Sequence, residues 1–189
     1  MYYFAERFST LMARIAGFAV LLTALVIAVE VTARKLFHVS LVGADEISGY
    51  VLAITVTWGA SLALIRRAHV RIDVVQAHLP RFFRVALDIL ALLSLLSVTL
   101  LFAWYATRLL HTNIRTGAVS NTQMEVPMWI PQSLWVAGFW IFAAIIVIVA
   151  LSTLHAMVAR DFGRAHHVAG MRGALEESSD ETAEARARR

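Results

Sequence analysis

Four long apolar stretches restrict this chain to an architecture that spans a membrane. Residues 47–65, 89–107 and 126–154 contain no charged side chain, and residues 15–33 contain only Glu30. Each stretch has at least nineteen residues, and a helix of that length covers about 28 Å, close to the thickness of a bilayer's hydrocarbon core. A helix on a soluble protein would show a polar stripe, and these stretches do not. The sequence therefore predicts an all-α integral membrane protein with four transmembrane helices. The expected spans are 14–37, 45–66, 85–109 and 127–155.

The composition excludes several classes of protein. Of the 189 residues, 59% are hydrophobic, and the segments outside the four spans are too short to bury a core of their own. A soluble catalytic domain is therefore not expected. The sequence pI is about 10.1, but the basic residues gather at the ends of the spans, where they meet lipid headgroups, so no nucleic-acid partner is predicted. The chain has no cysteine, which excludes disulfides, thiolate metal sites and a quinone-linked disulfide-forming enzyme.

The distribution of basic residues predicts that both termini are cytoplasmic. In that orientation thirteen of the seventeen Lys and Arg residues lie inside, and the ratio is still ten to four without the arginines of residues 186–189. The alternative is a cleaved signal peptide, because basic residues precede an apolar core at 15–29. This core continues into Glu30 and then Arg34 and Lys35, and the cleavage-site candidate is poor, so we favour a retained span.

The connecting segments also carry patterns. In residues 66–84, apolar residues recur at intervals of three to four, and polar residues lie between them. Pro80 interrupts this pattern. This pattern predicts a short amphipathic helix at the cytoplasmic interface, between the second and third spans. Residues 1–160 thus form the expected membrane domain. Residues 161–189 are polar and acidic, and we expect a disordered cytoplasmic tail.

The chain offers no residues for catalysis or for a cofactor. A haem protein would need histidines facing each other inside the spans, but all seven histidines lie at span ends or in loops. The zinc-protease motif His-Glu-x-x-His is absent. We also find no nucleophile–base pair, no phosphate-binding loop and no paired carboxylates that would face a cavity. The sequence therefore predicts a protein that is not an enzyme and that holds neither a metal nor another cofactor.

Two acidic residues are candidates for structural or functional roles. Glu30 lies well inside the first span, where an ionisable side chain is costly. Arg34 follows four residues later, so a local ion pair on one helix face is the favoured interpretation. Coordination of an ion or substrate, or a contact between subunits, are the alternatives. Glu46 opens the second span, and it either forms a clamp with Arg34 across the first hairpin or belongs to a solvated first turn.

Two further patches are candidates for contacts. Gly59-Ala60-Ser61 is a group of small residues that allows another helix to approach closely, and that helix belongs either to this chain or to another subunit. The second patch runs from Arg66 to Asp73 and is basic. We favour a topology anchor there, and the alternative is a fixed network in which Asp73 holds one of the arginines.

The order and spacing of these elements resemble a known family. The chain is similar, over residues 15–154, to the DctQ-type small membrane subunit of tripartite ATP-independent periplasmic (TRAP) transporters. The resemblance rests on these elements: Arg34, Glu46, Gly59-Ala60, the turn His69-Val70-Arg71-Ile72-Asp73, Ser120, Thr122, and Val126-Pro127 followed by Trp129. One departure is Val136-Ala137-Gly138, where the family often has a proline before the glycine, and it leaves the geometry of that helix open.

The resemblance implies a scaffold in a bacterial inner membrane. In this family a periplasmic substrate-binding protein delivers an organic acid to the membrane complex, and the large membrane subunit carries the substrate and sodium sites. The small subunit packs on the immobile part of the large one and helps to dock the binding protein. By resemblance we expect Arg34, Glu46, His69, Arg71 and Asp73 to be structural ties. The outer loops 38–45 and 108–125 are the expected docking surfaces.

Two other classes stay open at the level of sequence. A homo-oligomeric channel or exporter would need a polar path, and only Glu30 and a few hydroxyl side chains are available to line one. A membrane anchor of a respiratory complex is the second alternative, and an absorbance scan for haem would test it.

Overall fold

The computed structural model describes residues 2–38, 43–66 and 81–158. They form four long helices, and each is long and apolar enough to cross a membrane. The prediction of an all-helical protein with four such helices is therefore confirmed. The helices are α1 (Tyr2–Phe37), α2 (Ala44–Ile65), α4 (Arg81–Thr116) and α5 (Trp129–Val158). The predicted interfacial helix falls largely on residues outside the described ranges, as does the predicted tail.

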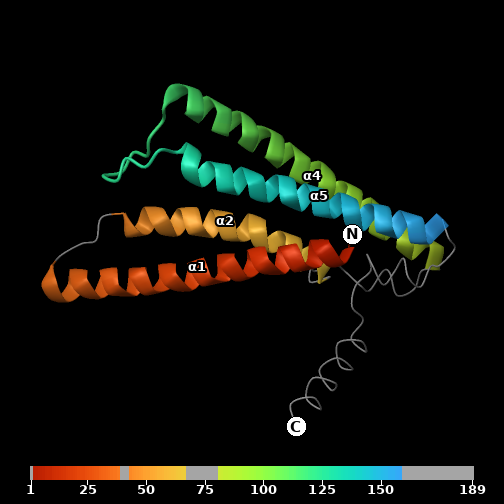
Figure 1. Cartoon of the computed structure of the whole chain (residues 1–189), viewed down its shortest axis with the longest axis horizontal. Coiled ribbons are helices and arrows are strands. Elements are labelled where there is room, and N and C mark those ends of the chain that lie inside the picture. Colours follow the sequence, from red (N-terminus) through yellow and green to blue (C-terminus); the bar gives the residue numbers. More distant parts are fainter. Residues whose placement is uncertain (1, 39–42, 67–80, 159–189) are drawn as a thin grey trace, which may run out of the picture.

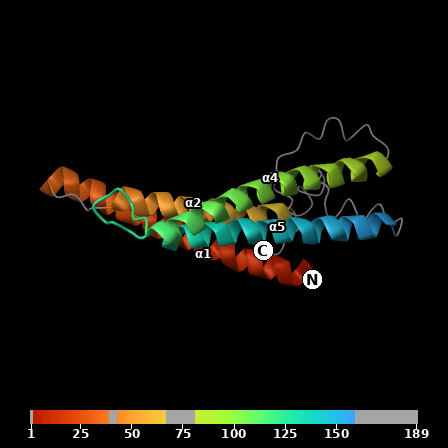
Figure 2. The same cartoon turned by 90° about the horizontal axis from the view of Figure 1, so that it is seen from above.

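The helices form two hairpins that lie side by side in the order α1, α2, α5, α4 (Figure 1). Helices α2 and α5 are the inner pair, and the two views show α4 crossing α5 obliquely (Figures 1 and 2). Helix α1 ends and α2 begins at the end of the molecule that carries the loop between α4 and α5 (Figure 1), and we call this end the hairpin end. The opposite end, where α1 begins, is the N-terminal end. Because α2 and α5 both start at the hairpin end, they run parallel to each other.

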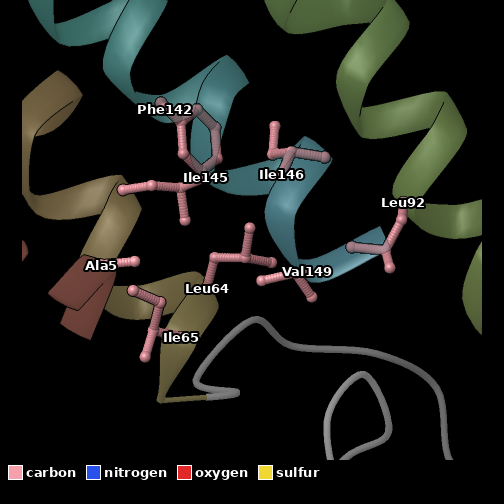
Figure 3. Close-up of a cluster of buried hydrophobic side chains, with 8 residues drawn as sticks. All are labelled: Ala5, Leu64, Ile65, Leu92, Phe142, Ile145, Ile146 and Val149. Atoms are coloured by element: carbon pink, nitrogen blue, oxygen red, sulfur yellow. The ribbon is translucent and has the colours of Figure 1, made fainter. Parts of the chain in front are cut away.

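The main apolar core lies toward the N-terminal end and is built around α5. Four α5 side chains enter it, and α1, α2 and α4 supply the rest (Figure 3). The cluster consists of Ala5, Leu64, Ile65, Leu92, Phe142, Ile145, Ile146 and Val149. The outer helices α1 and α4 leave large apolar side chains exposed, such as Phe18 and Leu101. Such outward faces suit hydrocarbon or another membrane protein rather than water.

Helix α1 is longer than its apolar stretch. It starts at Tyr2, because the sequence has no proline or glycine before Gly17 to interrupt the helix. A narrow stripe of mostly small residues faces the rest of the protein: Ala5, Ser9, Met12 and Ala16. Their spacing of four, three and four residues places them on one side of the helix, so α1 packs through one edge and leaves its other sides outward.

Helix α4 also continues beyond its apolar stretch, to Thr116. The outer loop expected at 108–125 is therefore shorter than predicted, because its first nine residues belong to α4. Gly117, at φ 62°, ends the helix with the left-handed conformation that glycine adopts without strain. Two side-chain hydrogen bonds join α4 to α5 near this end: Asn113 to Gln132 at 2.9 Å and Trp140 to Thr107 at 3.0 Å.

Helices α2 and α5 meet closely at Gly138. A Cβ atom at this position would lie 2.4 Å from Thr57 Oγ1 and 2.8 Å from Trp58 Cδ1, closer than side chains can approach. The indole of Trp58 donates a hydrogen bond to the Leu134 carbonyl at 3.1 Å. The segment that lacks the family's proline thus lies within a continuous α5, and its glycine is where the two inner helices touch.

Candidate functional site

The hairpin end brings the loop between α4 and α5 onto the first turn of α2. Gly43 precedes α2 in a left-handed conformation, with φ 90°. A Cβ at Gly43 would lie 1.8 Å from the sulfur of Met124, so another residue would strain the backbone and displace the Met124 side chain. The loop therefore rests directly on the start of α2.

A chain of hydrogen bonds connects the two segments and ends on the carboxylate of Glu46. The Val126 amide donates to Ser120 Oγ at 3.1 Å, and the hydroxyls of Ser120 and Thr122 lie 2.9 Å apart. The Thr122 hydroxyl then donates to Glu46 Oε2. Each hydroxyl can accept one bond and donate the next, and such chains strengthen their members. The carboxylate is thus the final acceptor of a chain that begins in the loop backbone.

The second oxygen of Glu46 is occupied as well. Tyr50, one helical turn further along α2, donates its phenol to Glu46 Oε1 at 2.5 Å, and the phenol oxygen is 3.5 Å from Met128 Sδ. Hydrogen bonds to an ionised carboxylate are stronger than those between neutral groups. Oε2 of Glu46 therefore holds the loop against α2, and Oε1 ties the carboxylate to Tyr50 within α2. We call Glu46, Tyr50, Ser120 and Thr122 the loop latch.

The loop has a backbone frame that positions the latch hydroxyls. Val119 and Pro127 form an antiparallel bridge. The Ser120 amide donates to the Val126 carbonyl at 2.9 Å, and the Met128 amide donates to the Ala118 carbonyl at 3.0 Å. Ser120 is buried within this frame. The two sides of the loop therefore hold each other, and Thr122 projects from its tip toward α2.

The expected clamp between Arg34 and Glu46 is not present. Arg34 pairs instead with Glu30, at 3.2 Å between Nη2 and Oε2, and the Glu30 side chain is 6% exposed while that of Arg34 is 59% exposed. The physical reason is proximity, since residues four apart on a helix meet without any cooperation from a loop. The favoured local pair is thus observed. The first turn of α2 is partly exposed, and Glu46 accepts hydrogen bonds there from Tyr50 and Thr122.

A comparison with protein families decides the identity of the chain. The model described as "Tripartite ATP-independent periplasmic transporters, DctQ component" matches residues 23–157. The chain belongs to the DctQ family. This family is a transporter component and not an enzyme family, and membership implies association with a large TRAP membrane subunit and a binding protein. A search of curated protein sequences gave no match.

The other residues that the sequence singled out in this DctQ subunit lie away from Glu46 or outside the described ranges. Gly59 lies on a partly exposed side of α2, and a Cβ there would meet nothing within 4 Å, so no other described helix uses it. Pro127 takes part in the loop frame, and Trp129, 48% exposed, is the first residue of α5. His69, Arg71 and Asp73 lie outside the described residues.

Three features of the DctQ subunit escaped the sequence reasoning. Tyr50 could have been found, because it stands four residues from Glu46 on the same helix face. Thr122 could not be paired with Glu46, since 76 residues separate them. Asp88 is fully buried in the second turn of α4. It directly precedes the charge-free stretch 89–107, so hydropathy alone does not mark it as buried.

Two grooves on the described part of the DctQ subunit are apolar. One lies between α2 and α4 above α5, has a volume of about 550 Å³ and is lined by residues such as Leu52, Val98 and Phe139. The other lies between α1 and α5, has a volume of about 490 Å³ and includes Phe4 and Ile148. Within the described ranges, no three His, Asp or Glu side chains come together as a metal site. These surfaces suit hydrocarbon or another helix.

Proposed function

We propose that this DctQ subunit is the fixed scaffold of a sodium-driven TRAP transporter that imports an organic acid with the help of a periplasmic binding protein. It resides in a bacterial inner membrane with both termini in the cytoplasm. The hairpin end, which carries the loop latch, then faces the periplasm. The excess of basic residues on the N-terminal side supports this orientation.

The observation that carries the scaffold role is the apolar character of the grooves. Both are lined mainly by apolar side chains, and the Thr57 and Thr99 hydroxyls in one of them bond to carbonyls of their own helices. An organic acid or a sodium ion would find no charged ligand there. Of the buried carboxylates, Glu30 is paired on its own helix, and Asp88 lies in the second turn of α4. Substrate and ion sites are therefore expected on the large subunit.

Helix α2 supplies the face that we propose for packing on the large subunit. Gly49, Leu52, Val56 and Gly59 follow one another at spacings of three, four and three residues on its outward side, and all are exposed or partly exposed. Small residues on such a face allow the backbones of two membrane helices to approach closely. By contrast, the outward faces of α1 and α4 carry mainly large aliphatic and aromatic side chains, as a lipid-facing surface would.

The loop latch supports a role in docking the binding protein. A partner that binds and leaves in each cycle benefits from a surface that is already ordered, because little conformational entropy is then lost on binding. The Glu46 carboxylate fixes the α4–α5 loop by way of Thr122. The latch thus presents residues 117–128 as a preformed surface.

The scaffold proposal is tested by co-purification of the large subunit with tagged DctQ variants. We expect Gly49→Trp and Gly59→Trp to weaken association by about 1–2 kcal/mol, and so to reduce the recovered partner several-fold. Leu93→Trp is the matched control, because Leu93 is 49% exposed on α4 and lies on the side away from the groove between α2 and α4.

Reconstituted uptake tests the transport step. We expect sodium-dependent uptake of an organic acid only when the DctQ subunit, the large subunit and the binding protein are all present. Uptake by the DctQ subunit alone, or a homo-oligomer that carries no partner, would overturn the scaffold role.

A further inference from the structure

Met124 lies in the loop between α4 and α5, where this loop contacts the start of α2. Its sulfur and Cγ occupy the space that a Cβ atom at Gly43 would take, so the thioether covers the bare backbone of that glycine. The Met124 amide also donates a hydrogen bond to the Thr122 hydroxyl at 3.4 Å. One methionine side chain therefore joins the loop to α2 directly beside the loop latch.

Met124 is also the most exposed of the three methionines whose side chains the structure describes. It is 40% exposed, whereas Met12 is 5% exposed within the packing of α1. Met128 is half-buried, and its sulfur lies 3.5 Å from the Tyr50 phenol. A small oxidant dissolved in water therefore reaches Met124 more readily than the other two.

A methionine thioether is oxidised by transfer of one oxygen atom, for example from hydrogen peroxide. The sulfur lone pair attacks a peroxide oxygen, and an S–O bond forms as the O–O bond breaks. The hydroxide that leaves takes the proton of the transferred oxygen and becomes water. The sulfur loses two electrons and the peroxide gains them. The product is methionine sulfoxide, which is polar and larger at the sulfur.

The sulfoxide does not suit the place that the thioether occupies. The sulfur already lies against Gly43, so an added oxygen has no room on that side. The S–O group is a hydrogen-bond acceptor that is solvated best by water, and the side chain no longer packs as an apolar cover over the glycine. The hydrogen bonds of the latch are not themselves oxidised. The loop then loses one attachment to α2 and keeps the other.

We propose that Met124 is an oxidation site, at which a peroxide converts the thioether to the sulfoxide and thereby loosens the α4–α5 loop from the start of α2. The orientation proposed above places this side chain in the periplasm, where oxidants from outside the cell arrive first. The loosening itself depends neither on that orientation nor on the docking role of the loop, so its test is independent of both.

Peroxide treatment of the subunit in nanodiscs of saturated lipid tests the proposal. Peptide mass spectrometry should find the added oxygen on Met124 at least about fivefold faster than on Met12. Hydrogen–deuterium exchange of residues 117–128 should then rise about threefold. The two methionine sulfoxide reductases, one for each sulfoxide epimer, should reverse this rise. Equal oxidation rates of Met124 and Met12, or complete oxidation of Met124 with unchanged exchange, would overturn the proposal.

Matched variants assign the effect to one sulfur. Met124→Leu keeps an apolar side chain of similar size that peroxide does not oxidise, so exchange in its loop should be the same before and after treatment. Met128→Leu is the control, and peroxide should raise its exchange as it does in the unaltered subunit. A rise in treated Met124→Leu, or no rise in treated Met128→Leu, would assign the loosening to a different residue and contradict the proposal.

Discussion

At the scale of single residues, the loop latch shows how one carboxylate orders a segment far away in the sequence. Glu46 accepts hydrogen bonds from Tyr50 on its own helix and from Thr122 on the loop. The Thr122 hydroxyl is also hydrogen-bonded to the Ser120 hydroxyl, which accepts a bond from the backbone amide of Val126. An acidic residue at the start of a helix is ordinary, since it suits the helix dipole. Glu46 is also the final acceptor of a hydrogen-bond chain, and this role depends on the loop between α4 and α5 lying against α2.

Loss of the latch should loosen the loop without unfolding the subunit. In Glu46→Gln the charge is lost, and in Thr122→Val the link to the loop is lost, each at a cost of about 1–3 kcal/mol. We expect the amides of residues 117–128 to exchange with deuterium at least several-fold faster in both variants, as followed by mass spectrometry. Asp45→Asn is the control, because Asp45 is the exposed neighbour of Glu46 and takes no part in the latch. Unchanged exchange in both latch variants would refute the role of Glu46.

At the scale of helices, the contact between α2 and α5 depends on one missing side chain. Gly138 touches Thr57 on the neighbouring helix, and the Trp58 indole bonds to the α5 backbone beside it. The two hairpins are joined mainly through this inner pair. The spacing of α2 and α5 therefore determines how the hairpins sit against each other.

A methyl group at this contact should be costly. Gly138→Ala places a Cβ 2.4 Å from Thr57 Oγ1, so the helices must separate, and we expect a loss of about 1–3 kcal/mol of unfolding free energy. Thr57→Ala in the same chain should restore part of this loss. Gly17→Ala is the matched control, because a Cβ there meets nothing within 4 Å. It should be neutral or stabilising by about 0.5–1 kcal/mol. Chemical denaturation in mild detergent measures all three, and equal midpoints for Gly17→Ala and Gly138→Ala would show that the contact is not tight.

At the scale of the whole molecule, the sequence predicted the helices but not their packing. Long uncharged stretches must be helical in a bilayer, because the backbone has to satisfy its own hydrogen bonds there. The helix ends were less certain. Polar residues already occur in the last turns of α4 before Thr116 and in the first turns of α1 after Tyr2. Such residues mark where the hydrocarbon core of the bilayer ends, but the helix itself can continue beyond that point. The contacts of Glu46 with Thr122 and of Thr57 with Gly138 join distant residues, and no local pattern encodes them.

The orientation of the molecule is open to a direct test, because the chain has no cysteine and needs no background substitutions. Asn121 lies at the exposed tip of the α4–α5 loop, and Ser178 lies in the sequence after α5. With both termini in the cytoplasm, a membrane-impermeant maleimide should label Asn121→Cys in intact spheroplasts and should label Ser178→Cys only after lysis. The reverse pattern would put the loop latch in the cytoplasm, and a periplasmic protein could then not dock on residues 117–128.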